Sequence, residues 1–361
     1  MKKIYGIFRG FPGLGRVSSG ISILKEFQKI GYDIAGISYL QGLEALHKQS
    51  IPLLFNYNIK ESDITSIGIN PITNFATEII AKILDEKPDI IIIDGEPLLQ
   101  STLCDVYPKE KVVSLLNPSD LHNDTLPEST IKFYHKNYLS CSNVIVHGIG
   151  IKNKIINKNN CYIYYIPTLL RQEILEISAV DYRSKRIIGI LGGGSVNSSN
   201  EFIKSTIEIG IKIVLLAKYL DTYNFDIYCN DTFIKNEIEK LVSLPSNVNI
   251  ISSYTAPSEI YRNVRMAIVR AGRNVSSELL FLGIPSLLVA TSGDYRAKEQ
   301  EKNIDNIILE SAQLFNKINL ADEIKVLIDK VNKTLNSSSG KNIFVPGNKY
   351  AIKILKKIIG D

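Results

Sequence analysis

Short apolar runs alternate with longer amphipathic segments along most of the chain. Lys3–Phe8 and Asp89–Asp94 are apolar nearly throughout, whereas Val17–Ile30 places its apolar residues at helical spacing. A strand that shows no polar alternation is buried on both faces, which is typical of a parallel sheet covered by helices. The pattern therefore predicts an α/β protein built from repeated strand–helix units.

This alternation stops and restarts once. Ile166–Lys185 has no clear period, and the pattern resumes with a strand at Arg186–Leu191. We therefore expect two α/β domains of similar size, over residues 1–166 and residues 167–348. The 361 residues are enough for two such domains. A last helix, within residues 349–361, is expected to pack back on the first domain.

Composition excludes several classes of protein. With 45% hydrophobic and 22% charged residues the chain is typical of globular proteins, and its net charge of +5 is a weak bias. The chain contains no Lys/Arg block interleaved with aromatic residues, which is the pattern that would suggest nucleic-acid binding. The four cysteines form no Cys-x-x-Cys pair, which favours reduced thiols. No signal peptide and no membrane-spanning run is recognisable, so we expect a cytoplasmic protein.

A glycine-rich turn, Gly192–Ser195, directly follows the strand that opens the second half. The next segment, from Ser198 to Glu201, has the spacing of a capping box at the start of a helix. Glycines let a ligand approach the backbone, and the free N–H groups of a helix N-terminus suit a diphosphate. The alternative is a tight strand-to-helix turn without a ligand.

A second turn, Arg270–Asn274, leaves another predicted strand and begins a helix that Gly283 ends. Glu278 falls in the early turns of that helix, where a carboxylate can accept hydrogen bonds from two ribose hydroxyls. The alternative is an acid placed near a helix N-terminus for its favourable interaction with the dipole. Farther along, Glu299 and Gln300 offer groups that suit sugar hydroxyls, or else begin a solvated helix.

In order and spacing, these pieces resemble the donor half of GT-B glycosyltransferases, closest to the family-28 group that includes the N-acetylglucosaminyltransferase making lipid II. The resemblance implies that the Ala271-Gly272 turn receives the diphosphate, that Glu278 holds the ribose and that Glu299 with Gln300 reads the sugar. It also places the base beside Tyr254 and Thr255. The implied donor-binding residues are Gly193, Gly194, Ser195, Tyr254, Thr255, Gly272, Arg273, Asn274, Ser277, Glu278, Glu299 and Gln300.

The N-terminal half resembles the acceptor domain of the same fold. The resemblance thus implies two facing Rossmann-like domains with a cleft between them: an acceptor-binding domain over residues 1–166 and a nucleotide-sugar donor-binding domain over residues 167–348. Gly13, Gly15 and Arg16 lie where the family carries a Gly-x-Gly-His type loop, and Arg16 occupies the position of the histidine. This departure removes the family's first-domain histidine as a base. Arg16 is then expected to hold a donor phosphate or an anionic acceptor, or to be a solvated residue at a helix start.

Two polar clusters follow predicted strands of the first half and supply candidates for a general base. Asp94 and Glu96 come after the first strand, and Asp120 and His122 after the next. Ligands of open α/β sheets bind at the carboxyl ends of strands. An acceptor hydroxyl must lose its proton while the nucleotide diphosphate leaves, which makes a carboxylate there a suitable base. Asp94 or Glu96 is the first choice, with Asp120 and His122 in reserve.

The resemblance implies an inverting, metal-independent transferase that moves a sugar from a UDP- or dTDP-sugar to a hydroxyl of a small-molecule or lipid-linked acceptor. It would serve cell-envelope or natural-product glycosylation. No cofactor or metal is expected, since helix N-termini can stabilise the leaving diphosphate. Alternatives are a nucleotide-sugar hydrolase, a 2-epimerase or an inactive binding protein of the same fold. An apolar patch at Leu53, Leu54, Phe55 and Tyr57 would allow weak membrane contact, although a core role explains it equally well.

Overall fold

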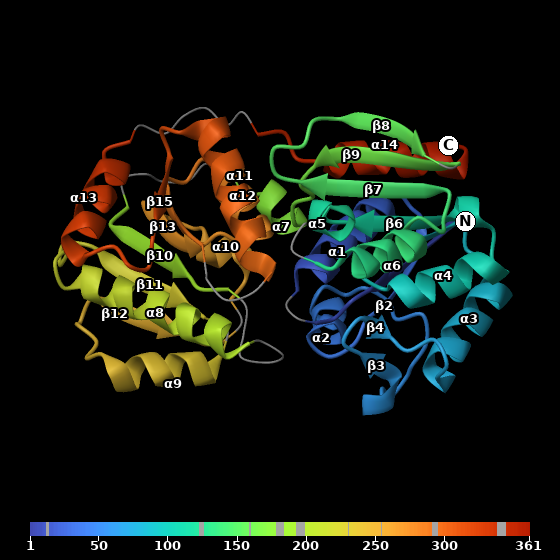
Figure 1. Cartoon of the computed structure of the whole chain (residues 1–361), viewed down its shortest axis with the longest axis horizontal. Coiled ribbons are helices and arrows are strands. Elements are labelled where there is room, and N and C mark those ends of the chain that lie inside the picture. Colours follow the sequence, from blue (N-terminus) through green and yellow to red (C-terminus); the bar gives the residue numbers. More distant parts are fainter. Residues whose placement is uncertain are drawn as a thin grey trace. The chain divides into compact units, whose positions relative to one another are not determined.

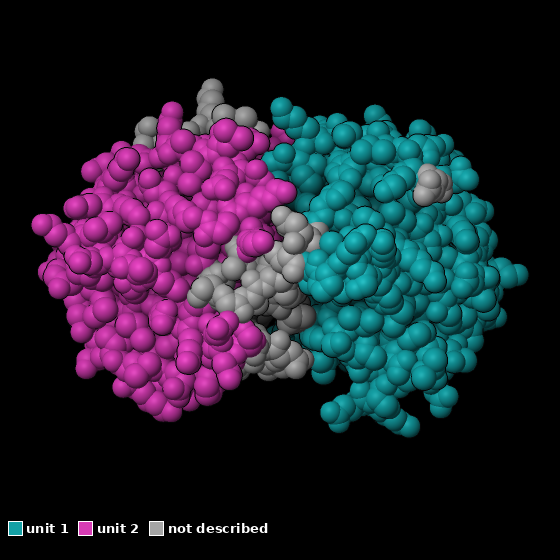
Figure 2. Space-filling view, in the orientation of Figure 1, with its two compact units in different colours: residues 1–172, 346–361 teal, residues 173–345 magenta. Residues whose placement is uncertain are grey.

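The chain forms two compact units in a computed structural model (Figure 2). Unit 1 comprises residues 1–172 together with 346–361, and unit 2 comprises residues 173–345. The residues that the structure describes are 1–11, 14–122, 126–158, 160–177, 184–192, 199–229, 231–253, 255–290, 295–337 and 344–361.

Unit 1 is built around one sheet whose neighbouring strands are parallel except for the last pair (Figure 1). Across the sheet the order is β2 (Asp33–Ile37), β1 (Lys3–Phe8), β5 (Ile90–Asp94), β6 (Val112–Leu116), β7 (Asn143–Gly148), β9 (Cys161–Pro167) and β8 (Lys154–Lys158). A separate antiparallel pair is formed by β3 (Ile64–Thr65) and β4 (Gly68–Ile69).

Helices cover both faces of this sheet, as the apolar runs of its strands require. One core cluster joins the sheet to α1 (Gly15–Lys29), α2 (Gln41–Lys48) and α14 (Asn348–Ile359). The other joins it to α3 (Asn74–Glu86), α4 (Pro97–Val106) and α6 (Glu128–Tyr138). Two short helices, α5 (Pro118–Leu121) and α7 (Gln172–Leu175), and two 3₁₀ turns, Glu61–Asp63 and Lys109–Lys111, complete the assigned helical elements up to residue 175.

Unit 2 contains an all-parallel sheet. Its strands lie in the order β12 (Val248–Ile251), β11 (Asn224–Tyr228), β10 (Arg186–Ile190), β13 (Met266–Arg270), β14 (Ser286–Val289) and β15 (Phe315–Ile318). Its helices are α8 (Asn200–Ala217), α9 (Thr232–Leu241), α10 (Pro257–Ile260), α11 (Arg273–Leu282), α12 (Tyr295–Ser311) and α13 (Ile324–Leu335). The α/β architecture expected from the alternating runs is confirmed.

Both sheets reverse their strand order at one point. In unit 2 the chain proceeds outward from β10 to β12 and then returns to β13 on the other side of β10. Unit 1 does the same between β1 and β5. Ligands of open α/β sheets bind at such switch points, beyond the carboxyl ends of the two strands. The loops that follow β1 and β5, and those that follow β10 and β13, are therefore where binding residues belong.

The division between the units lies at residue 172 instead of the expected 166. The cause is a buried polar clasp that holds residues 168–170 in unit 1. The side chain of Asn348 accepts a hydrogen bond from Leu170 N (2.9 Å) and donates to Leu170 O (2.9 Å) and Ser22 Oγ (2.8 Å). Beside it, Gly347 N donates to Thr168 O at 2.9 Å. These contacts also place the last helix, α14, on unit 1 next to α1.

The apolar patch proposed at residues 53–57 is not formed, because these side chains belong to the core. Leu54 is buried and Phe55 and Tyr57 pack against the same core cluster, where the Tyr57 ring centroid lies 4.9 Å from that of Phe75. Tyr57 also hydrogen-bonds the backbone of Ser38. Within the described ranges, no helix is both long and apolar enough to cross a membrane.

Candidate functional site

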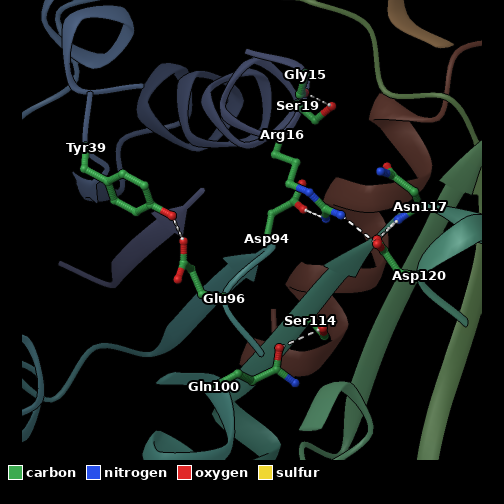
Figure 3. A network of polar contacts seen from close by, with 10 residues as sticks. All are labelled: Gly15, Arg16, Ser19, Tyr39, Asp94, Glu96, Gln100, Ser114, Asn117 and Asp120. Atoms are coloured by element: carbon green, nitrogen blue, oxygen red, sulfur yellow. Dashed lines mark hydrogen bonds and ion pairs between the residues drawn. The ribbon is translucent and has the colours of Figure 1, made fainter. Parts of the chain in front are cut away.

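Arg16 joins two aspartates at the switch point of unit 1 (Figure 3). It is the second residue of α1, whereas Asp94 ends β5 and Asp120 lies on α5, just after β6. The Nη1 atom of Arg16 lies 2.5 Å from Oδ1 of Asp94, and its Nη2 atom lies 2.6 Å from Oδ1 of Asp120. Three chain segments far apart in the sequence therefore meet in one ion-paired group.

Gly95 shapes the turn that lets Arg16 reach Asp94. Its φ is +83°, a conformation that L side chains rarely adopt. A Cβ on Gly95 would lie 2.6 Å from Cδ of Arg16 and 2.8 Å from Cβ of Arg9, so any larger residue would displace the arginine. The glycine after β5 is thus required both for the turn and for the close approach of Arg16.

The ion-paired group is unevenly exposed. The Asp94 side chain is fully buried, while the side chains of Asp120 and Arg16 are 13% and 18% exposed. Burial disfavours the guanidinium charge, but Asp120 and Asp94 together hold the pKa of Arg16 well above its ordinary value. Arg16 is therefore not the solvated residue considered from the sequence, since its charge is engaged by two carboxylates.

Glu96 lies beside this group in a different environment. The Tyr39 hydroxyl donates to its Oε1 and Ile69 N donates to its Oε2, both at 2.5 Å, and the residue is 1% exposed. Gly68 has a φ of +117° and a side chain there would collide with the carboxylate. Burial raises the pKa of Glu96 to about 7, against the lowering effect of the Tyr39 and Ile69 hydrogen bonds and of Arg9 and Arg16. Glu96 thus anchors the β3–β4 pair to the site.

The remaining sequence candidates of unit 1 have separate surroundings. His122 is exposed at the end of α5, and its ring centroid lies 6.5 Å from that of His135. The Gly15 carbonyl accepts a hydrogen bond from Ser19 Oγ at 3.1 Å, within the first turn of α1. Gly13 lies outside the described residues. Tyr39, which no motif singled out, is the partner that sequence reasoning missed.

In unit 2, α11 begins directly beyond β13, at the switch point. Gly272 precedes the helix, and its N–H donates to Arg270 O at 2.7 Å. Arg273 and Asn274 open the first turn, and Ser277 and Glu278 follow in the second. The hydroxyl of Ser277, like that of its neighbour Ser276, is buried and has no hydrogen-bond partner among the described residues.

Glu278 is buried to 1% exposure, and the hydroxyl of Tyr261 donates to its Oε2 at 2.7 Å. Tyr261 follows the short helix α10 and was not a sequence candidate. The contact fixes the carboxylate on the inner side of α11.

Arg270 connects the two glycine-containing turns of unit 2. Its guanidinium carbon lies 4.2 Å from the ring centroid of Phe202, in the first turn of α8. A Cβ on Gly192, whose φ is +60°, would come within 3.1 Å of the Arg270 Nη2 atom. The end of β13, the turn after β10 and the start of α8 therefore meet around this cation.

Gln300 is 4% exposed on α12, while Glu299 is partly exposed. Thr255 is partly exposed just before α10. Gly193, Gly194, Ser195 and Tyr254 lie outside the described residues. Within the part of the chain that is described, no group of three or more His, Cys, Asp or Glu side chains could hold a metal ion.

Comparison with known proteins shows that the chain is similar to sugar transferases. No family model matches it. Over 99% of its length it is 23% identical to a protein of Clostridium botulinum (strain Kyoto / Type A2), of which 99% is covered. That protein is a UDP-N-acetylglucosamine–N-acetylmuramyl-(pentapeptide) pyrophosphoryl-undecaprenol N-acetylglucosamine transferase. A transferase of the same name from Clostridium tetani is 26% identical, with 94% of this chain and 95% of the relative covered.

Solved structures share the fold. The glycotransferase of kitacinnamycin superposes with a TM-score of 0.60 at 12% identity, over 99% of this chain and 95% of its own. Acinetobacter baumannii MurG gives a TM-score of 0.57 at 12% identity, over 99% of this chain and 100% of the MurG chain. A UDP-GlcNAc 2-epimerase from Neisseria meningitidis, bound to UDP-GlcNAc, gives a TM-score of 0.62 at 14% identity, over 98% of this chain and 100% of the epimerase chain.

These likenesses confirm the interpretation of the sequence. The fold is GT-B, and over nearly its full length the chain is similar to glycosyltransferases, as its resemblance to the family-28 group implied. The 2-epimerase likeness matches the alternative considered from the sequence, but at 14% identity it concerns the fold alone.

Proposed function

We propose that the protein transfers a sugar from a UDP-sugar to a hydroxyl group of a lipid-linked acceptor, with inversion and without a metal. One observation carries this proposal: the chain matches, from end to end, relatives whose names specify a UDP-sugar donor and an undecaprenol-linked acceptor. The donor half of that similarity includes the turn at Gly272, which lies at the switch point of unit 2. A dTDP-sugar, which the sequence alone left open, is less well supported.

Unit 2 supplies groups suited to a nucleotide diphosphate. α11 begins directly beyond β13, and the backbone N–H groups of a helix N-terminus suit a diphosphate. The buried hydroxyls of Ser276 and Ser277 lie at this helix start and have no partner among the residues that the structure describes. Glu278, fixed by Tyr261, is proposed to accept the ribose hydroxyls. N–H groups at a helix start stabilise a leaving diphosphate without a metal, which fits the expectation that no metal or cofactor takes part.

Unit 1 is proposed to bind the acceptor and to supply the general base. Its switch point carries the carboxylates of Asp94, Glu96 and Asp120, with Arg16 among them. A base of this kind contributes typically 10²- to 10⁴-fold to the rate of proton-coupled steps. Inversion follows when the acceptor oxygen attacks the anomeric carbon from the side opposite the diphosphate.

The second candidate function is a UDP-sugar 2-epimerase or hydrolase. The observation that favours it is the TM-score of 0.62 with the 2-epimerase from Neisseria meningitidis, slightly above the 0.60 and 0.57 of the two transferases. An epimerase interconverts the donor sugar without an acceptor, and a hydrolase releases UDP into buffer. The transfer proposal predicts that UDP release depends on the lipid-linked acceptor.

The test has two parts. Calorimetry with UDP, dTDP, GDP, CDP and ADP should show binding of UDP, and Glu278→Ala should weaken it at least tenfold. UDP release and product formation are then measured with UDP-N-acetylglucosamine, with and without N-acetylmuramyl-pentapeptide pyrophosphoryl-undecaprenol. Failure of every nucleotide to bind would overturn the proposal. Conversion of the donor sugar without acceptor would favour the epimerase.

We further propose a cytoplasmic enzyme in weak contact with an anionic membrane face. The undecaprenol acceptor of the relatives supports this, since it resides in a membrane. So does α14, which exposes Lys349, Lys353 and Lys357 along one side. Each lysine near an anionic surface contributes about 1 kcal/mol. Co-sedimentation with vesicles containing phosphatidylglycerol should exceed that with pure phosphatidylcholine, and equal binding to both would sink the idea.

A further inference from the structure

We infer that Asp120 is the group that accepts the proton of the acceptor hydroxyl, and that Arg16 is the positioning residue that holds it in place. The inference deepens the proposed transfer reaction and rests on it. It selects one residue from four that the sequence left open and gives Arg16 a role other than binding phosphate.

Exposure separates the candidates. A base must come within hydrogen-bond distance of the proton it removes, so its carboxylate must be reachable. The Asp94 side chain has no exposure, and Glu96 is 1% exposed with both of its oxygens already accepting hydrogen bonds. The Asp120 side chain is 13% exposed, so it is the carboxylate of this group that an acceptor can reach.

Two contacts fix the Asp120 carboxylate. Its Oδ1 meets Nη2 of Arg16 at 2.6 Å, and its Oδ2 accepts a hydrogen bond from Asn117 N at 2.8 Å. The second contact ties the side chain to the first turn of α5, three residues back in the chain. Each oxygen still has a lone pair, so a carboxylate held this way is oriented without being saturated.

The position of Arg16 is unfavourable unless it serves these carboxylates. It occupies the first turn of α1, where the helix dipole repels a cation. Its planar fork spans Asp94 with one nitrogen and Asp120 with the other, which the point charge of a lysine cannot do in the same geometry (Figure 3). Asp94, buried at the end of β5, thus anchors Arg16, and Arg16 in turn orients Asp120.

In the proposed step the acceptor O–H proton passes to Asp120. The acceptor oxygen forms a bond to the anomeric carbon as the bond from that carbon to the diphosphate oxygen breaks, and UDP leaves with the electron pair. Among the described residues, Tyr138 on α6 also interacts electrostatically with Asp120, besides Arg16 and Asp94. Burial keeps the pKa of Tyr138 well above its ordinary value, so this phenol stays neutral.

The test compares Asp120→Asn with Asp322→Asn. Asp322 is a matched control in unit 2: its Oδ2 accepts a backbone N–H from Asn319, three residues earlier, at 3.0 Å, and pairs with Lys330 at 2.7 Å. We expect Asp120→Asn to lower kcat by about 10² to 10⁴-fold while the Kd for UDP stays within about twofold. Asp322→Asn should leave both nearly unchanged.

Arg16 is tested by comparing kcat with the Kd for UDP in two variants. Arg16→Lys should lower kcat about tenfold and leave the Kd for UDP unchanged, because charge is kept but the fork is lost. Arg16→Gln should lower kcat further than Arg16→Lys, since the charge that holds the Asp120 carboxylate is lost as well, while the Kd for UDP stays unchanged. A purely structural role would instead weaken UDP binding together with kcat, and Arg16→Lys would not differ from Arg16→Gln.

The outcomes separate this inference from the proposed function. Wild-type protein that neither binds UDP nor releases it from UDP-N-acetylglucosamine contradicts the transfer reaction itself. Wild-type protein that turns over the donor, together with an Asp120→Asn variant of equal kcat, overturns the assignment of Asp120. Loss of turnover in Asp94→Asn but not in Asp120→Asn would transfer the role to Asp94.

Discussion

The hydroxyl of Tyr261 donates a hydrogen bond of 2.7 Å to the carboxylate of Glu278, and both side chains are 1% exposed. The contact joins the residue after α10 to the second turn of α11. It orients a carboxylate that family resemblance assigns to the ribose, so the affinity for the nucleotide should depend on a tyrosine that need not touch the ligand.

Replacing Tyr261 by Phe removes this hydrogen bond. Because hydrogen bonds to charged groups contribute about 1.5–3 kcal/mol, the free energy of unfolding should fall by about that much. A less firmly held Glu278 should also raise the Kd for UDP roughly threefold to tenfold, which corresponds to about 0.6–1.4 kcal/mol. Urea unfolding and calorimetry check the two effects. Tyr219→Phe, at a residue 62% exposed, is the control and should change neither.

Glu96 should make stability depend on pH between about 4.5 and 7. Burial raises its pKa from an ordinary value of 4.5 to about 7, so the folded state favours the protonated form. The resulting stabilisation is fully present below pH 4.5 and is lost as the pH rises through 7. At 1.36 kcal/mol per pKa unit the loss amounts to about 3 kcal/mol.

Unfolding of Glu96→Gln across pH 5–8 measures this contribution. The amide cannot ionise, so the fall in stability toward pH 8 should largely disappear. Glu86, whose pKa is lowered to about 2, affects stability only at more acidic pH and does not interfere. A variant that keeps the full wild-type slope would show that Glu96 is not its source. Glu44→Gln, at an exposed site, serves as the control.

Gly95→Ala should displace Arg16, and Gly31→Ala separates this effect from backbone strain. The two glycines have similar φ angles, +83° and +86°, but a Cβ on Gly31 meets nothing within 4 Å. Strain alone costs about 1–3 kcal/mol at such positions. Gly95→Ala should be further destabilised and should lose activity, because its Cβ would lie 2.6 Å from Arg16. Equal stability and equal kcat in the two variants would contradict the close approach.

Asn348→Ala should loosen the C-terminal helix. The substitution removes three buried hydrogen bonds, to Leu170 N, Leu170 O and Ser22 Oγ, at an expected cost of about 2–4 kcal/mol. Hydrogen exchange should show faster exchange over α14 and residues 168–170, with unit 2 unaffected. Asn332→Ala, at an exposed residue of α13, is the comparison. Unchanged protection of α14 would show that the clasp is dispensable.

The sequence predicted those parts of the fold whose burial leaves a pattern. β1 and the core of β5 match the apolar runs that predicted them, since both faces of these strands are covered. The exposed edge strand β8 (Lys154–Lys158) was not predicted, because its apolar and polar residues do not alternate as they do in a strand with one buried face. The sequence left open whether Leu54 and Phe55 form a surface patch or belong to the core, because an irregular segment has no period that indicates which residues are covered. In the structure they belong to the core.

The candidate site was predictable in position but not in pairing. Carboxylates were expected after β5 and β6 because strand ends carry ligands in such sheets. That Arg16 bridges Asp94 and Asp120, or that Tyr39 holds Glu96, depends on contacts between residues at least 57 positions apart. Such contacts depend on how the sheet folds in three dimensions, and no local spacing encodes them. The same holds for Tyr261, which no motif marks.

The clasp at Asn348 also determines how this protein can be rebuilt. Because Gly347 N donates to Thr168 O, the chain leaves unit 1 and re-enters it at nearly the same point. Unit 2 is therefore an inserted domain, and the two chain ends of unit 1 that flank the insertion lie next to each other. Excising residues 173–345 and closing the gap with a short linker should leave a folded unit 1. The proposed function implies that grafting a different donor unit into the same two junctions would change the transferred sugar without redesign of the residues proposed to bind the acceptor.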